Sequence, residues 1–568
     1  MNLITPYTSV PSMSVDEYTR VVLSSARTGC FLVFASVCAL SVIAEATHAS
    51  RRIRSVREER VESNLTFAPK PHKASSAKRG ETAHAAISQS SRRSRLSAKN
   101  AKLMRFFFVV KRDSKLYFAR FSMGGIEALL ACRASLRAWA EFGVVLGLFF
   151  FADRTNFLGN MDKSYDRDLF LVLFLGFAAY GWSTSLQKSN TAEPLNREQT
   201  EEWKGWMQVL FLLYHYFKAS EVYNAIRLCI ASYVWMTGFG NFSYYHGQKD
   251  FSSPRFWQMM WRLNFFVFFT CIIMNNSYTL YYICPMHTMF TFFVYFILLV
   301  YKDYNCLTRV IVGKLFLCAF LVFVIWEVPG VFGVVFRPLT FLLKYTDPER
   351  PDIDPMHEWF FRSGLDRYIW IYGMGCAYVL PQFEAFLTWV DTRRVLIRVA
   401  TQTMIAGATF LVIFWYYQTY YMLPKNEYNK IHPYTSWIPI TCFIILRNLT
   451  LTARSVHANL FCKCGRITLE TYISQFHVWL STSNIHDGQP NKLFCLIPGY
   501  PLLNFVVATI AYLGISRRVF VITNVLKATC VPTNSQKIRA HAAFGVIIAL
   551  MSTATGFVVV ESYERRTS

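Results

Sequence analysis

The chain has 568 residues, of which 53% are hydrophobic and 17% are charged, and its formal net charge is +24. The length would allow several soluble domains, but apolar stretches of roughly 17–25 residues recur along the chain, and that length matches the hydrocarbon core of a bilayer. The alternating pattern of a membrane β-barrel is absent. The sequence therefore predicts an all-α, polytopic helical membrane protein with about 12–14 transmembrane helices.

The first apolar run, 28–46, is followed by Arg51 and Arg52, a pattern typical of a membrane anchor rather than of a cleaved signal peptide. Further apolar runs follow in order, and the two near 205–243 are short or interrupted. The predicted spans are 28–46, 138–152, 169–185, 205–217, 222–243, 262–283, 286–301, 314–336, 368–390, 399–420, 434–452, 467–481, 500–516 and 541–560.

The basic segment 51–137 carries most of the excess charge, because 21 Lys and Arg against 6 Asp and Glu give it a net charge of +15. A basic segment can bind nucleic acid, but beside membrane spans it is more typical of a cytosolic loop that touches anionic lipid. We therefore expect contact with membrane lipids and no nucleic acid. Residues 51–103 are rich in Ser, Ala, Arg and Lys, so the loop is predicted to be largely disordered.

These features divide the chain into an N-terminal region with the first anchor (1–50), the basic loop (51–137), a multi-span membrane domain (138–560) and a tail (561–568). With 51–137 in the cytosol, the net-positive loops 246–262, 302–313, 391–398, 453–466 and 516–540 fall on the same side, as expected for a membrane protein. The loops predicted on the lumenal side are 153–168, 338–367, 421–433 and 482–498. Only 186–204, at −1, departs from the rule. Asn64, in the sequon Asn64-Leu65-Thr66, is expected to stay unglycosylated.

The 14 cysteines show no metal-binding spacing. Cys462 and Cys464 are too close for a zinc knuckle, and no CxxC pair occurs. No metal and no bound cofactor are predicted.

The stretch NNSYTLYYICPMHTMF, 275–290, crowds polar side chains into an apolar run. Asn275, Tyr278 and Tyr282 fall at i, i+3 and i+7 and would share one helical face. Pro285 begins the next span, and His287 follows in its first turn. Because ionisable groups in spans usually face a bundle interior or a wet cavity, this stretch predicts a cavity or an active site. The alternative is a satisfied core histidine.

The stretch GRITLETYISQFHVWL, 465–480, places Glu470, Ser474 and His477 at i, i+4 and i+7 on one helical face. A buried glutamate needs a partner, and Arg447 is the natural candidate. A structural polar clamp and a path for an acyl donor or acceptor both fit this pattern.

Two further polar clusters could be functional or could have a purely structural explanation. Residues 215–227 include Lys218 and Glu221, which could pair locally or be solvated in a short connection. The loop 344–367 contains His357, Glu358 and Arg362, and could simply cap the bundle.

Motifs of soluble enzymes are absent: no GxSxG, P-loop, HExxH or GxGxxG occurs, and the DxxH pattern at Asp354 has no Gly-Asp-Ser block to accompany it.

Several long strings resemble a known family. They are EEWKGWMQVLFLLYHYFKASEVYNAIR (201–227), YVWMTGFGNFSYY (233–245), QMMWRLN (258–264), YYICPMHT (281–288), PLTFLLKYTDP (338–348), RSGLDRYIWIYGM (362–374), YNKIHPYTSWIPIT (428–441) and GRITLETYISQFHVWL (465–480). They closely resemble the plant reduced wall acetylation proteins. More distantly, they resemble the membrane half of the fungal capsule O-acetylation protein and of the animal sialic-acid O-acetyltransferase. The resemblance covers about 130–540.

The resemblance implies a multi-pass Golgi membrane protein in the O-acetylation of glycans, with acetyl-CoA as donor and a cell-wall type polysaccharide as acceptor. It makes 138–560 an acyltransferase-type domain that takes acetyl from cytosolic acetyl-CoA and delivers it to the lumen. Fungal and animal relatives carry a lumenal SGNH domain, and this chain has the basic loop in its place. A separate lumenal SGNH-type transferase is therefore an expected partner.

A histidine in a low-dielectric cavity could act as general base or carry the acetyl group. The candidates are His287, His477 and His357, in that order, with Glu470 or Glu358 to orient an imidazole. The residues expected to bind substrate are Asn275, Asn276, Tyr278, Tyr282, Arg362, Arg447 and Ser474. Two other functions remain open: a transporter that moves acetyl-CoA or another donor intact, and a non-catalytic scaffold.

Overall fold

The computed structural model describes residues 15–66, 125–155, 157–347, 350–486 and 489–567. The chain forms two units, one of residues 1–32 with 142–568 and a smaller one of residues 33–141. In the smaller unit, Glu45 of α1 (Val15–Thr66) and Arg133 of α3 (Arg133–Arg154) form an ion pair at 3.6 Å. Because α1 runs to Thr66, the start of the loop predicted to be largely disordered is helical. Residues 67–124 of that loop lie outside the described residues.

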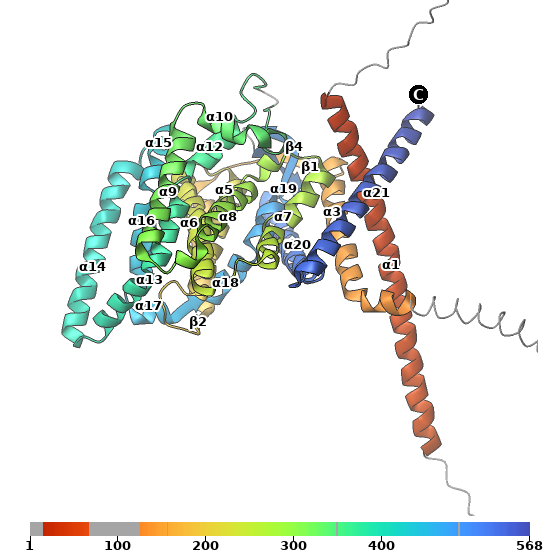
Figure 1. The fold of residues 1–568 in the computed structure, drawn as a ribbon, viewed down its shortest axis with the longest axis horizontal. Coiled ribbons are helices and arrows are strands. Elements are labelled where there is room, and N and C mark those ends of the chain that lie inside the picture. The colour runs from red at the N-terminus through yellow and green to blue at the C-terminus, as the bar shows by residue number, and fades with distance from the viewer. Residues whose placement is uncertain (1–14, 67–124, 156, 348–349, 487–488, 568) are drawn as a thin grey trace, which may run out of the picture. The chain divides into compact units, whose positions relative to one another are not determined.

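The larger unit is a bundle of helices (Figure 1). Its helices are α4 (Arg167–Thr184), α5 (Arg197–Phe217), α6 (Tyr223–Gln248), α7 (Ser253–Met274), α8 (Ile283–Leu299), α9 (Thr308–Glu327), α10 (Val331–Phe336), α11 (Thr340–Leu343), α12 (His357–Leu365), α13 (Ile369–Asp391), α14 (Val395–Tyr416), α15 (Lys425–Thr435), α16 (Trp437–Asn448), α17 (Leu451–Ser455), α18 (Asn459–Arg466), α19 (Thr468–Val478), α20 (Pro501–Cys530) and α21 (Ser535–Thr567). The predicted all-α class is confirmed.

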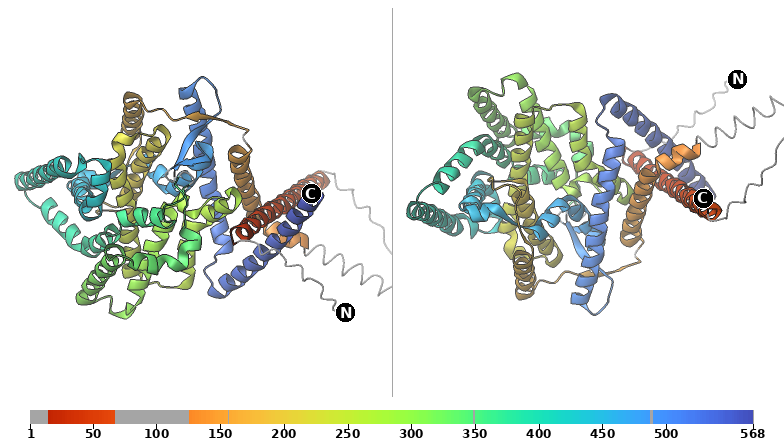
Figure 2. Two further views of the ribbon diagram at one scale, coloured as in Figure 1. Left: turned by 90° about the horizontal axis from the view of Figure 1, so that it is seen from above. Right: turned by 90° about the horizontal axis from the view of Figure 1, so that it is seen from below.

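Seven helical segments among the described residues are long and apolar enough to cross a membrane. They are Arg20–Ile53, Arg133–Arg154, Ser253–Met274, Thr308–Glu327, Val395–Tyr421, Pro501–Cys530 and Ser535–Tyr563, and three shorter apolar segments are Ile283–Leu299, Val331–Leu343 and Trp437–Asn448. Helix α14 lies at the outer edge of the bundle (Figures 1 and 2) and exposes Leu396 and Leu411 by 83% and 71%. Such an apolar outer face is expected to meet lipid.

Two predicted spans are shorter in the structure, one because a polar residue caps the helix and the other because the chain continues as a strand. Helix α7 stops at Met274, and Asn275 adopts a left-handed φ of 53° that caps it. Residues Tyr278–Tyr281 then form a 3₁₀ turn, so the single helical face predicted for Asn275, Tyr278 and Tyr282 is wrong. Helix α19 has 11 residues, about 16 Å, which is too short for a bilayer core, and the chain turns into a strand at Leu480.

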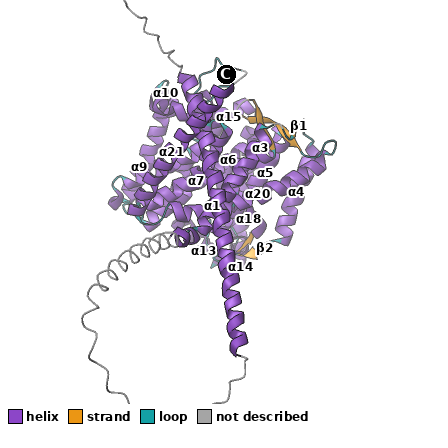
Figure 3. Cartoon of the chain, turned by 90° about the vertical axis from the view of Figure 1, so that its right-hand side faces the viewer, coloured by secondary structure: helices purple, strands orange, loops and turns teal. Residues whose placement is uncertain are grey.

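Two small antiparallel sheets, which the sequence analysis did not predict, lie at opposite ends of the bundle (Figure 3). One has the order β1 (Gly159–Asp162), β5 (Gln489–Cys495) and β4 (Leu480–His486), with Met161 opposite Leu493. The other pairs β2 (Leu186–Lys188) with β3 (Val456–Ala458), with Gln187 opposite His457.

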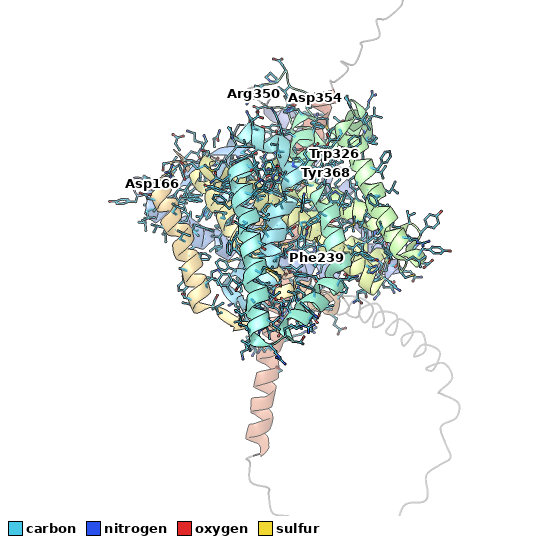
Figure 4. The ribbon with its side chains drawn as sticks, turned by 90° about the vertical axis from the view of Figure 1, so that its left-hand side faces the viewer. Asp166, Phe239, Trp326, Arg350, Asp354 and Tyr368 are labelled. Atoms are coloured by element: carbon cyan, nitrogen blue, oxygen red, sulfur yellow. The ribbon has the colours of Figure 1, made fainter. Side chains whose placement is uncertain are left out.

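The two ends agree with the alternation of sides predicted from the charges. The elements β1, α12, α15 and β4, which come from or border the loops predicted to be lumenal, lie at one end, and β2, α17 and α18 lie at the other (Figure 1). Asp166, Arg350 and Asp354 likewise lie toward the first end, whereas Phe239 lies nearer the second (Figure 4). Which end faces the lumen stays a prediction from the charge pattern, and the names lumenal end for the first and cytosolic end for the second follow that prediction.

Helices α6 and α13 approach each other closely through glycines. A Cβ on Gly238 would lie 1.9 Å from the Trp370 carbonyl oxygen, and one on Gly373 would lie 2.3 Å from the Trp235 carbonyl oxygen. Gly205 of α5 and Gly465 of α18 form a similar pair. Small residues that let helix backbones touch are common where membrane helices pack.

The Gly238→Ala substitution is expected to lower the free energy of unfolding by about 1–3 kcal/mol, because the added methyl overlaps the backbone of α13. Gly240→Ala, two residues away on the same helix, is the control, since a Cβ there meets nothing within 4 Å. Thermal unfolding in detergent measures both. Equal stability of the two variants would contradict the close approach of α6 and α13.

Candidate active site

A buried histidine and aspartate come together at the lumenal end of the bundle. Asp153 stands one residue before the end of α3, and His477 stands one residue before the end of α19. Nδ1 of His477 lies 3.1 Å from Oδ2 of Asp153, and the two side chains are shielded from solvent. A carboxylate only accepts hydrogen bonds, so Nδ1 carries the hydrogen and Nε2 presents its lone pair.

The start of β4 fixes the Asp153 carboxylate. Oδ1 accepts hydrogen bonds from the Ser481 hydroxyl at 3.0 Å and from the Thr482 backbone N–H at 2.8 Å. The Thr482 hydroxyl donates to Oδ2 as well. The carboxylate thus has four donors, which favour its charged form and hold it toward the imidazole.

Tyr281 completes the chain of hydrogen bonds on the far side of the imidazole. Its hydroxyl lies 2.6 Å from Nε2 of His477 and donates to that lone pair. Nδ2 of Asn276 donates to the same hydroxyl oxygen at 3.0 Å. Arg154 holds Asn276 in turn, because its NH2 group lies 2.6 Å from Oδ1 of Asn276 and 2.8 Å from the Met274 carbonyl oxygen. A tyrosine oxygen has two lone pairs, so one is left for a further donor.

A second buried cluster joins α6, the C-terminal end of α12 and α15. Arg227 NH2 donates to Oδ2 of Asp366 at 3.2 Å, and Nε2 of His432 lies 3.5 Å from Oδ1. Nδ1 of His432 lies 3.3 Å from the Tyr428 hydroxyl. The alternative of a solvated connection, left open for residues 215–227, is therefore wrong for Arg227, which is 1% exposed.

Arg362 borders this second cluster. Its Nε donates to Glu358 at 2.6 Å, and its guanidinium lies 4.7 Å from the centre of the Tyr282 ring. Tyr281 and Tyr282 are therefore neighbours in sequence that serve different clusters. Glu221 pairs with Arg167, not with Lys218 as the sequence analysis suggested.

Four other predicted site residues lie apart from His477. Nδ1 of His287 lies 2.6 Å from the Thr237 hydroxyl, between α8 and α6, and Tyr278 donates to Asn264. His357 is exposed at the start of α12, with its backbone N–H bonded to Asp354. Asn275 is exposed, too, as the cap of α7.

The pairing of Glu470 with Arg447 is wrong. Both NH groups of Arg262, on α7, hydrogen-bond the buried Glu470 carboxylate, the NH2 contact at 2.9 Å. Arg447 instead pairs with Glu202 of α5 at 3.2 Å. Arg262 stands at the boundary between the loop 246–262 and the predicted span 262–283, where the sequence pattern does not distinguish it from a loop charge.

Ser474 lies on the face of α19 between Glu470 and His477, fully buried, and its hydroxyl has no hydrogen-bond partner among the described residues. Asp153 was missed because it follows a predicted span directly and was counted with the loop charges, 324 positions from His477. Tyr281 lies in the polar stretch 275–290, but its position in the sequence gives it no specific role. The described residues contain no group of His, Cys, Asp and Glu able to hold a metal ion.

A model of the 10 TM Acyl Transferase domain found in Cas1p matches residues 81–543 of the chain. The chain belongs to this acyltransferase family. The match includes Asp153, Tyr281 and His477, so the buried Asp–His–Tyr arrangement lies within the acyltransferase domain.

Over 442 residues the chain is 29% identical to the N-acetylneuraminate (7)9-O-acetyltransferase of Danio rerio. The alignment covers 74% of this chain and 54% of that protein, so the chain spans about half the length of this curated relative. No solved structure matches the chain. Membership in the acyltransferase family agrees with the activity class predicted from the sequence, whereas the plant-type assignment stays a prediction.

Proposed function

We propose that the chain is a membrane-embedded O-acetyltransferase component that transfers acetyl from acetyl-CoA to a hydroxyl group on the lumenal side, with His477 as the base. The observation that carries this proposal is the buried chain of hydrogen bonds from Asp153 through His477 to Tyr281. A histidine oriented by a carboxylate and open at its other nitrogen to a hydroxyl is the arrangement that general-base acyl transfer requires.

The acceptor hydroxyl binds at the one free lone pair of the Tyr281 oxygen. The acceptor hydroxyl donates to this lone pair while the Tyr281 proton points to Nε2 of His477. As the acceptor oxygen attacks the thioester carbonyl carbon, its proton passes to Tyr281, and the Tyr281 proton passes to Nε2. Asp153 stabilises the imidazolium that forms.

The second half of the reaction restores the site. The tetrahedral intermediate collapses as the carbonyl re-forms and the C–S bond breaks, and the leaving sulfur takes up the proton that His477 returns through Tyr281. The products are an acetyl ester and a free thiol, and no oxidant, reductant or metal takes part. The Asp153 carboxylate stays charged throughout, since its four donors favour that form.

The similarity to a sialate O-acetyltransferase supports a glycan as the final acceptor. We place the protein in the Golgi membrane, where the family resemblance implies that glycans are acetylated. The family resemblance supports a separate lumenal SGNH-type transferase as the proposed partner that places the acetyl group on a wall-type polysaccharide.

The Tyr281→Phe substitution is expected to lower acetyl transfer about 10–100-fold, because the proton path between acceptor and His477 is lost while the ring still fills its space. Glycan O-acetylation in cells that lack the native protein and express the variant measures the effect.

Tyr304→Phe is the matched control, since this tyrosine is exposed near the cytosolic end and its hydroxyl bonds none of the described residues. Full acetylation by the Tyr281→Phe variant would overturn the role of Tyr281. Full acetylation in cells without the protein would overturn the proposed function as a whole.

A further inference from the structure

A pocket opens between α7, α19 and α20 at the cytosolic end of the bundle. It is lined by Trp261, Arg262, Phe265, Phe266, Leu469, Glu470, Thr523, Asn524 and Lys527. The neighbouring segments 246–262, 453–466 and 516–540 carry net charges of +2, +3 and +5. The pocket therefore lies where positive charge gathers around a membrane bundle.

The cations of the pocket exceed its carboxylates. Glu470 pairs with Arg262, whose guanidinium also lies 5.1 Å from the centre of the Phe520 ring. Lys527 makes no hydrogen bond or ion pair with any described residue, and the buried Nε of Arg255, near the start of α7, has no partner among them either. An ammonium group with all three donors unused is suited to a phosphate oxygen.

The pocket connects to the proposed catalytic histidine in two ways. Glu470 in its wall and His477 lie on the same face of α19, about 10 Å apart along the axis, with the unpartnered hydroxyl of Ser474 between them. Phe266 in the wall contacts Phe149 at 6.2 Å between ring centres, and Phe149 packs on the His477 ring at 5.3 Å. Two aromatic rings separate the pocket from the imidazole.

We propose that this pocket binds the phosphate groups of the acyl donor through Lys527 and Arg262, so that the thioester arm points along α19 toward His477. The ligand class is a phosphorylated nucleotide thioester that enters from the cytosolic side. This inference rests on the proposed function for the direction of the arm, but the binding of phosphate in the pocket can be tested separately. An anionic lipid headgroup offers the same phosphate chemistry from a different source.

The test measures the binding of tritiated acetyl-CoA to the full-length protein in phosphatidylcholine nanodiscs. Lys527→Gln is expected to weaken binding about 10-fold, since one charge-assisted hydrogen bond to phosphate is lost. Lys302→Gln, an exposed lysine at the same end, is the control and is expected to bind as the wild type. In steady state, Lys527→Gln is expected to raise KM for the donor and leave kcat unchanged.

Each outcome decides between the sources of phosphate. Equal binding by wild type and Lys527→Gln would overturn the proposal. In a second outcome, Lys527→Gln binds acetyl-CoA as the wild type does but no longer prefers phosphatidylserine over phosphatidylcholine. This result would overturn the proposal and identify a lipid headgroup as the phosphate source. If Lys527→Gln does not fold, protection of wild-type Lys527 from an amine-reactive label by acetyl-CoA replaces the variant, and absence of protection overturns the proposal.

The His477→Ala variant separates this proposal from the proposed function. It is expected to bind acetyl-CoA as tightly as the wild type, because His477 lies beyond the two rings that close the pocket. Normal binding with normal transfer would contradict the proposed function but not the phosphate site. Loss of binding in His477→Ala, with the fold intact, would contradict the phosphate site.

Discussion

The His477→Ala substitution is expected to lower acetyl transfer by about 10²–10⁴-fold, because the base that takes the acceptor proton is removed. Asp153→Asn is expected to lower acetyl transfer by a similar factor, since an amide in this position can no longer fix Nδ1–H of His477 or stabilise the imidazolium. The measurement is release of free thiol from acetyl-CoA by the purified protein with a hydroxyl acceptor.

Two control variants are available for this pair. His541 is exposed on α21 and Asp162 is exposed in β1, where it pairs with Lys492 at 2.6 Å. His541→Ala and Asp162→Asn are expected to transfer acetyl as the wild type does. Retention of more than a third of wild-type transfer by His477→Ala would rule out His477 as the base.

The Asp366→Ala substitution is expected to lower the free energy of unfolding by about 3–5 kcal/mol. Asp366 is 1% exposed and faces the equally buried Arg227 at 3.2 Å, so its removal leaves an unpaired guanidinium inside the bundle. The neighbouring His432 loses the same carboxylate. Reversible thermal unfolding in detergent, at constant protein and detergent concentration, measures the difference.

The exposed pair of Glu221 and Arg167 provides the comparison. Glu221→Ala removes a carboxylate that water already solvates, so it is expected to lower the free energy of unfolding far less than Asp366→Ala does. The double variant Arg227→Leu/Asp366→Leu removes both charges and is expected to be more stable than Asp366→Ala alone. Equal stability of Asp366→Ala and Glu221→Ala would contradict the burial of the Arg227–Asp366 pair.

The helical class and the alternation of sides could be predicted from the sequence because hydrophobic length and loop charge act locally. Where helices end inside the bundle could not be predicted in the same way. The apolar run through 262–283 continues past Met274, and only the left-handed turn at Asn275 stops α7 there. The run through 467–481 contains no helix breaker, and its last residues pair with β5 instead.

Only the residues of the candidate site on α19 could be predicted from the sequence, because their pattern is also local. His477, Glu470 and Ser474 stand out because polar residues on one face of an apolar helix are costly unless they serve a purpose. Their partners, Asp153 and Arg262, belong to other helices far away in the sequence, and each stands at the edge of a predicted span. At such an edge a charge facing water and a charge facing the bundle have the same sequence pattern.

The sequence pattern favours His287 over His477 because His287 lies in the more crowded polar stretch. In the structure its Nδ1 meets the Thr237 hydroxyl, and no carboxylate among the described residues hydrogen-bonds its ring. The hydrogen bond from the Tyr281 hydroxyl to Nε2 of His477 is what links that stretch to the site, and Tyr281 stands on the turn before α8.

The most direct test of acetyl transfer by His477 uses sealed vesicles containing the purified protein and a hydroxyl acceptor in the lumen. Acetyl-CoA labelled with carbon-14 in the acetyl group and tritium in the CoA portion is added outside. The account predicts carbon-14 in the lumen without tritium, and neither label in the lumen for His477→Ala. Entry of both labels in equal amounts, undiminished in His477→Ala, would instead identify a transporter and contradict the account.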